Sequence, residues 1–130
     1  MYKQAVLSLA SCKNTTISEY NAGALTGTAI NATIDNVHIA GGSVGGFDTI
    51  GGLVGSMTNG SINNSSSSAN IEANSTSISS TGGLVGGLHE GTIENSYSTG
   101  NVNGTEYIGG LIGYMTSGTI TSSWASGNVS

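Results

Sequence analysis

The feature that most constrains the fold of this chain is a five-residue unit, here called the anchor, that occurs four times with glycine at both ends. Its first glycine stands at positions 23, 51, 82 and 109, so the units follow one another at intervals of 28, 31 and 27 residues. A period of this size is typical of solenoids and repeat arrays, in which each repeat forms one layer. The four anchors read Gly23-Ala24-Leu25-Thr26-Gly27, Gly51-Gly52-Leu53-Val54-Gly55, Gly82-Gly83-Leu84-Val85-Gly86 and Gly109-Gly110-Leu111-Ile112-Gly113.

The similarity between the repeats extends beyond the anchor. An isoleucine follows the last glycine of each anchor by seven positions, and a further aliphatic residue comes later in each repeat. Short runs of β-formers separated by glycine indicate brief strands with bends between them. When coils stack about 4.8 Å apart, each strand pairs with its equivalents, so like residues form ladders. The predicted interior ladders are Leu25, Leu53, Leu84 and Leu111; Ile34, Ile62, Ile93 and Ile120; and Val44, Ile71, Val102 and Val129.

A polar position two residues after each isoleucine predicts a corner of the coil. Asn36, Asn64 and Asn95 occupy this position in the first three repeats. Asparagine suits turn backbone and its amide can bond along the stack, so we expect an asparagine ladder there. Leu53 and Val54 are both apolar, so an alternation of apolar and polar residues cannot show which of them faces inward.

The fold predicted from this pattern is an all-β protein, a β-solenoid of about four stacked coils of 27 to 31 residues with a leading partial coil. We expect the length differences to lie between the last aliphatic column and the next anchor, where Asn74 to Ser80 forms a loop. In the leading segment, Leu7 and Ile17 fit the Ile and Val columns. The predicted boundaries are 1–22 for the partial leading coil, 23–50 for a divergent first repeat, 51–81 and 82–108 for the second and third, and 109–130 for an incomplete fourth, all in one solenoid domain.

The composition excludes several classes of protein. Only 7% of the residues are charged, the formal net charge is −5, and Lys3 and Lys13 are the only basic side chains apart from the histidines. Nucleic-acid binding and an anionic membrane surface both need clustered Lys or Arg, so neither is expected. No apolar stretch approaches the roughly 20 residues of a membrane span.

Cys12 is the single cysteine, so no disulfide can form within the chain. The segment Leu9-Ala10-Ser11-Cys12 is similar to the lipobox of bacterial lipoproteins, although few residues precede the cysteine. The alternative, which the repeat pattern favours, places Cys12 within an ordinary strand of the leading coil.

The repeats resemble the GLUG repeat, a family named for its Gly-Leu-(apolar)-Gly core and found in bacterial and other microbial surface proteins, including large adhesins and non-catalytic parts of immunoglobulin A peptidases. The match is closest in residues 82–104 and 109–129, whereas Ala24, Thr26 and Ala32 depart from the pattern in the first repeat. The resemblance implies a right-handed β-helix-like fold, an extracellular location at the cell surface or as a secreted protein, and no catalytic residues.

The residues give no sign of an active site, a metal site or a cofactor, and we expect the protein not to be an enzyme. Asp35 and Glu94 share a column, but Asn63 lies between them and the chain has no arginine to stabilise developing charge. His38 and His89 fall in different columns without a further ligand at metal-binding spacing.

Two surface features are candidates for binding or modification. The column of His38, Ser66, Tyr97 and Trp124 could present Tyr97 and Trp124 to a carbohydrate, or its rings could pack along the stack. Sequons for N-glycosylation begin at Asn14, Asn31, Asn59, Asn63, Asn64, Asn74, Asn103 and Asn128.

The pattern starts and stops within a repeat, and no polar cap is visible. We therefore expect a segment of a longer array or a subunit that stacks on copies of itself. The leading functional prediction is a structural rod or stalk of an extracellular adhesin or filament. The alternatives are a module that binds surface glycans or host proteins and, less favoured, a non-catalytic region of a larger secreted enzyme.

Overall fold

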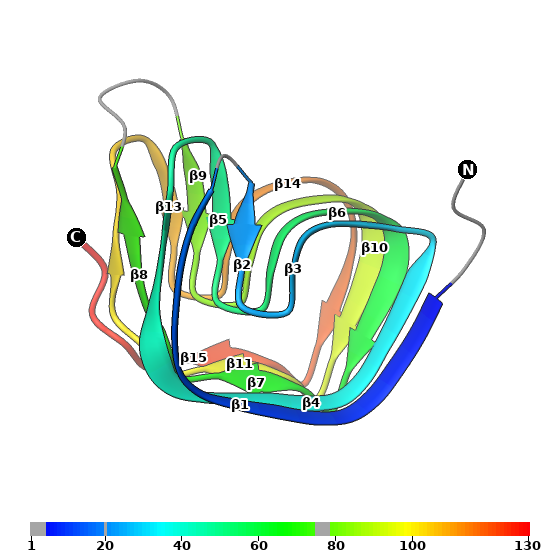
Figure 1. Cartoon of the computed structure of the whole chain (residues 1–130). Helices are drawn as coiled ribbons and strands as arrows, with labels where there is room; N and C mark the ends of the chain where they lie inside the picture. The colour runs from blue at the N-terminus through cyan, green and yellow to red at the C-terminus, as the bar shows by residue number, and fades with distance from the viewer. Residues whose placement is uncertain (1–4, 20, 75–78) are drawn as a thin grey trace.

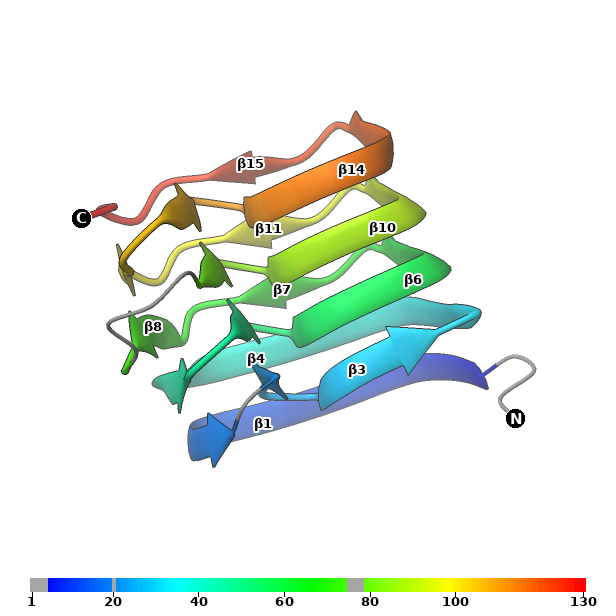
Figure 2. The same cartoon turned by 90° about the horizontal axis from the view of Figure 1, so that it is seen from above.

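The structure is a computed structural model that describes residues 5–19, 21–74 and 79–130. Within these ranges the chain forms parallel β-strands and no helix, which confirms the predicted all-β solenoid. Figures 1 and 2 show the coils stacked above one another. The strands are β1 (Ala5–Glu19), β2 (Ala22–Gly23), β3 (Thr26–Ile30), β4 (Ala32–Gly46), β5 (Thr49–Gly51), β6 (Val54–Asn63), β7 (Ser66–Ser67), β8 (Asn70–Ala73), β9 (Ser80–Gly82), β10 (Val85–Glu94), β11 (Tyr97–Ser98), β12 (Val102–Asn103), β13 (Tyr107–Gly109), β14 (Ile112–Thr121) and β15 (Trp124–Ala125).

The register of the strands follows the sequence repeat. In the anchor sheet, Gly51 pairs with Gly23 on one side and with Gly82 on the other, and Gly82 pairs in turn with Gly109. The isoleucines and the later aliphatic residues pair in the same way from coil to coil. Strand β1 continues the stack, because Leu7 pairs with Ile34, Cys12 with Ile39 and Ile17 with Val44 in β4.

The interior is filled by the ladders that the sequence predicts. In the middle coils these side chains lose all or nearly all contact with solvent, which is the main driving force for coils of this kind to stack. At the ends of the described stack the burial falls: Leu25 and Leu111 are half-buried, and Ile120 and Val129 are 40% and 48% exposed because no described coil covers them. The buried members are Leu53, Leu84, Ile34, Ile62, Ile93, Val44, Ile71 and Val102.

The anchor is a turn that points into the interior. In Figure 1 the chain descends from β2 or β5, turns deep inside the coil and rises again as β3 or β6. The turn therefore has core on both sides, which is why Leu53 and Val54 are both fully buried. The sequence left open which of Leu53 and Val54 faces inward, and the structure shows that both face the core.

Glycine is required in the anchors of the middle coils because backbone packs against backbone there. A Cβ at Gly55 would lie 2.8 Å from the Thr49 carbonyl oxygen of the opposite limb, and one at Gly52 would lie 2.5 Å from Ser67 Oγ across the interior. Real Cβ atoms do not approach this closely. The spacing of the glycines is thus a steric requirement of the inward turn.

One expectation about length was wrong. Ile39 pairs with Ser67 and Ser43 pairs with Asn70, so three residues of the first repeat lie opposite two of the second. The first repeat therefore carries an extra residue inside the strand region. Gly41 and Gly42 absorb it with φ angles of 79° and 88°, a conformation that glycine adopts without strain. The predicted loop from Asn74 to Ser80 includes residues 75–78, which lie outside the described residues.

Candidate functional site

The predicted corner does adopt turn backbone. Asn36, Asn64 and Asn95 all have positive φ angles, of 57°, 50° and 49°, which asparagine tolerates better than most residues. The side chains do not form one simple ladder, however. Asn95 Nδ2 lies 3.5 Å from Asn64 Oδ1, whereas Asn64 Nδ2 donates to Asp35 Oδ1 at 2.9 Å. Asn36 leaves the ladder because its Oδ1 bonds the His38 ring at 3.1 Å instead.

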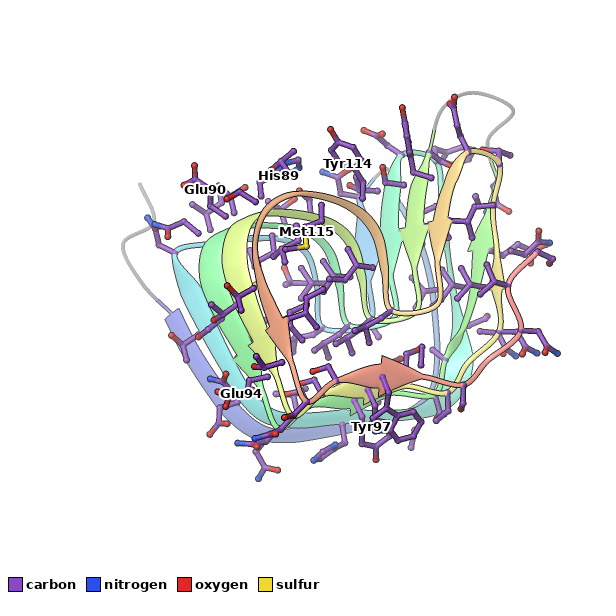
Figure 3. All side chains as sticks on the ribbon, turned by 180° about the vertical axis from the view of Figure 1, so that it is seen from behind. His89, Glu90, Glu94, Tyr97, Tyr114 and Met115 are labelled. Atoms are coloured by element: carbon purple, nitrogen blue, oxygen red, sulfur yellow. The ribbon has the colours of Figure 1, made fainter. Side chains whose placement is uncertain are left out.

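A second corner, which the sequence analysis missed, lies on the other side of the strand segment that carries the isoleucines. Asn31, Asn59 and Glu90 have φ angles of 51°, 51° and 58°, and Asn59 Nδ2 donates to Asn31 Oδ1 at 2.7 Å. The sequence feature that could have predicted this corner is the glycine after Asn59 and after Glu90, since a polar residue followed by glycine often marks a turn. Figure 3 shows Glu90 at this bend.

A ladder of serines lies just past the first corner and was also missed. Ser65 Oγ accepts from the Val37 N–H, Ser96 Oγ from the Ser65 N–H and Ser123 Oγ from the Ser96 N–H, each at 3.1 Å. Each hydroxyl also donates to the carbonyl two residues earlier in its own coil. The serines thus satisfy buried backbone groups where the corner interrupts the regular strand ladder.

The outer face of β7, β11 and β15 carries the ring column. Tyr97 and Trp124 lie in register, with ring centroids 4.7 Å apart and planes inclined by 3°. His38 Nδ1 bonds Ser66 Oγ at 2.8 Å. Tyr97 points outward from this face in Figure 3, and Trp124 is 51% exposed. The two aromatic side chains therefore both stack on each other and remain accessible.

A groove crosses this face at the level of Ser66, because serine is short and its neighbours in the column are rings. The groove has a volume of about 370 Å³, which falls within the range of about 300–1,000 Å³ of small-ligand sites. The described residues of its lining include no carboxylate, lysine or arginine. The residues are His38, Ile39, Ala40, Ser66, Ser67, Ser68, Tyr97 and Thr99.

A further aromatic pair closes the mouth of the inward turn in the last coil. Tyr107 on β13 and Tyr114 on β14 approach with centroids 5.2 Å apart, and Tyr114 also contacts His89 at 6.2 Å. The mouth of the first anchor is bridged instead by a hydrogen bond of 3.3 Å between Asn21 and Thr28. Figure 3 shows Tyr114 at this opening. The packing of Tyr107 against Tyr114 is therefore explained structurally, because it closes the opening between the two limbs of the inward turn.

The two carboxylates of the predicted acidic column lie two coils apart. Asp35, Asn63 and Glu94 occupy successive coils of one register column, as the sequence predicted, so Asn63 separates the carboxylates. No group of three or more His, Cys, Asp or Glu side chains that could hold a metal ion is present in the part of the chain that the structure describes. Nor do the described residues include a helix with the length and apolarity to cross a membrane.

The predicted glycosylation sites differ in their surroundings. Asn103 and Asn128 are exposed, and Asn128 donates its backbone N–H to Asn101 Oδ1 at 3.0 Å. The Nδ2 atoms of Asn59 and Asn64, where a glycan would be attached, are already used in corner hydrogen bonds. Asn31 and Asn63 are half-buried, and Asn74 is exposed. The Asn14 side chain and the two residues that complete the sequon of Asn74 lie outside the described part, and glycosylation stays a prediction.

The fold and its ladders define a repeat protein of the β-solenoid class, in which each coil is one repeat. A family model described as "The GLUG motif" matches residues 49–72 and 77–103. The match confirms the GLUG resemblance of the sequence pattern in these two segments. A search of curated proteins and a search of solved structures each found no match.

Proposed function

We propose that the chain is a structural rod or stalk segment of an extracellular surface adhesin or filament, which acts through the stacking of its coils. The observation that carries the proposal is the parallel pairing of every described coil with its neighbours, which brings the predicted columns into register. Any coil with the same columns extends the rod by one strand spacing, about 4.8 Å. The extracellular setting is supported by the resemblance of the repeats to those of microbial surface proteins.

The proposed partner is an adjacent set of repeats, either further along the same protein or in a second copy. The last described coil offers what such a partner needs. Strands β14 and β15 lie at the two ends of their sheet order, so each has one edge without a described neighbour. Beside this edge the core residues Ile120 and Val129 are 40% and 48% exposed. An apolar surface beside an unpaired strand edge favours the addition of another coil.

The test is sedimentation velocity of the 130-residue chain over a series of concentrations. We expect the sedimentation coefficient to rise with concentration, because copies stack through the end coil. Ile120→Lys places a charge in the stacking surface and should leave a species that does not associate. Thr119→Lys is the matched control, since Thr119 is an exposed neighbour in the same strand on its opposite face, and it should associate like the wild type.

A chain that stays monomeric at every concentration would count against self-assembly. Equal association of both lysine variants would show that the end coil is not the contact. Immunogold labelling of intact cells of the source organism tests the setting separately, because label that appears only after permeabilisation would contradict a surface location.

A further inference from the structure

The ring column on the outer face has a geometry that a passive rod does not need. The parallel rings of Tyr97 and Trp124 lie in neighbouring coils, so they stack along the axis of the solenoid. One face of Tyr97 is therefore covered by Trp124, and the opposite face is turned toward the level of Ser66. This uncovered face forms one wall of the groove described above.

The spacing of the coils sets the width of the groove. Tyr97 and His38 stand one coil above and one coil below Ser66, so about 9.5 Å separates their levels. A ring inserted at the Ser66 level would lie about 4.8 Å from the Tyr97 level, within the range of about 4.5–7 Å seen for stacked rings. His38 bounds the groove on the other side, with its Nδ1 bonded to Ser66 Oγ at 2.8 Å, so the volume available to a ligand ring lies between Tyr97 and the His38 side chain.

The floor and the far wall supply hydroxyls with unused hydrogen-bonding capacity. Ser66 is only 6% exposed and its Oγ makes a bond of 2.8 Å to His38 Nδ1, which leaves at least one further position on the oxygen. Ser68 Oγ accepts from the Gly41 N–H at 2.7 Å and donates to the Ile39 carbonyl at 3.2 Å, which leaves one lone pair. Thr99 adds an exposed hydroxyl at the rim.

We propose that this groove binds a neutral saccharide, with the apolar face of one pyranose ring against Tyr97 and its hydroxyls bonded to Ser66, Ser68 and Thr99. An acidic sugar is disfavoured because no lysine or arginine is found among the described residues that line the groove. A flat apolar ring would leave the remaining hydrogen-bonding positions of the serine hydroxyls unused, whereas a hexose supplies hydroxyls at its edge. Trp124 acts as a positioning residue, since it holds the Tyr97 ring from the other side. This inference goes beyond the rod proposal and does not depend on it.

The experiment is a calorimetric titration of the whole chain with neutral tetrasaccharides of glucose, mannose, galactose and N-acetylglucosamine. In the wild type, the NMR signals of the Tyr97 ring show where the ligand binds. We expect at least one of the tetrasaccharides to bind saturably. Tyr97→Ala removes the stacking wall and should weaken that binding by about tenfold or more. Ser66→Tyr fills the groove with a ring that continues the column, so calorimetry should detect no binding. Circular dichroism should show that this variant is still folded.

Tyr107→Ala is the matched control, because it removes an exposed tyrosine from the mouth of the inward turn and should bind like the wild type. The proposal is overturned if no neutral tetrasaccharide binds with a dissociation constant below about 10 mM. It is also overturned if folded Tyr97→Ala and Ser66→Tyr both bind as well as the wild type, or if only acidic oligosaccharides bind.

Discussion

Gly83→Ala is expected to destabilise the solenoid by about 3 kcal/mol or more, a large part of the roughly 5–15 kcal/mol that holds a domain folded. A Cβ at Gly83 would clash with the Gly110 carbonyl oxygen of the next coil and with Ser98 Oγ across the interior. The Gly110 carbonyl is backbone and cannot move alone, because Leu84 and Leu111 of the same two turns are hydrogen-bonded at 2.9 Å. Urea unfolding followed by circular dichroism measures the change.

The control for this substitution lies four residues away. A Cβ at Gly87 would meet Thr49 Cγ2 at 3.4 Å and His89 Nε2 at 3.5 Å, which are ordinary contacts. Gly87→Ala should therefore change the stability by less than about 1 kcal/mol. Equal effects of the two substitutions would show that the inward turn is not packed as described.

The second prediction compares two members of one ladder. Ile62→Ala should cost about 3–4 kcal/mol, because Ile62 is fully buried in a middle coil and its loss leaves a cavity. Ile120→Ala should cost about 1 kcal/mol, since Ile120 occupies the same column but is 40% exposed. The difference follows from the stacking of coils, because the two side chains are otherwise equivalent.

Chemical denaturation of both variants at one low protein concentration gives this comparison without self-association. Circular dichroism before unfolding should show the same β-rich spectrum for each. A cost at Ile120 equal to that at Ile62 would contradict the account, because it would mean that the last coil is as well covered as the middle ones.

The ladders could be predicted from the sequence because each rests on residues that recur at fixed positions. In Ile62 and Ile93, for example, the residue type, the distance from the anchor and the apolar character agree, so the column is visible without coordinates. The inward turn could not be predicted. Leu53 and Val54 are both apolar, and only the path of the chain through the interior shows that both are buried.

The outer face was predictable only in part. The column that contains Tyr97 and Trp124 was visible, but the stacking of the two rings and the groove over Ser66 depend on side-chain positions between coils. The serine ladder was overlooked although Ser65 and Ser96 stand at a fixed distance after the isoleucines, because serine is common throughout the chain and its role appears only in the hydrogen bonds. The extra residue at Gly41 was hidden by matching the repeats from the anchor alone.

The central claim is that repeats about 30 residues apart lie side by side in parallel register, and disulfide trapping tests it most directly. Ser61 and Thr92 are register partners in β6 and β10, so their Cα atoms should lie about 4.8 Å apart, within the disulfide range of about 4.4–6.8 Å. In a Cys12→Ser background, Ser61→Cys with Thr92→Cys should form a disulfide readily under mild oxidation. Ser61→Cys with Glu94→Cys, two residues out of register and about 8 Å apart, should not. Failure of the in-register pair, or equal trapping of both pairs, would contradict the solenoid described here.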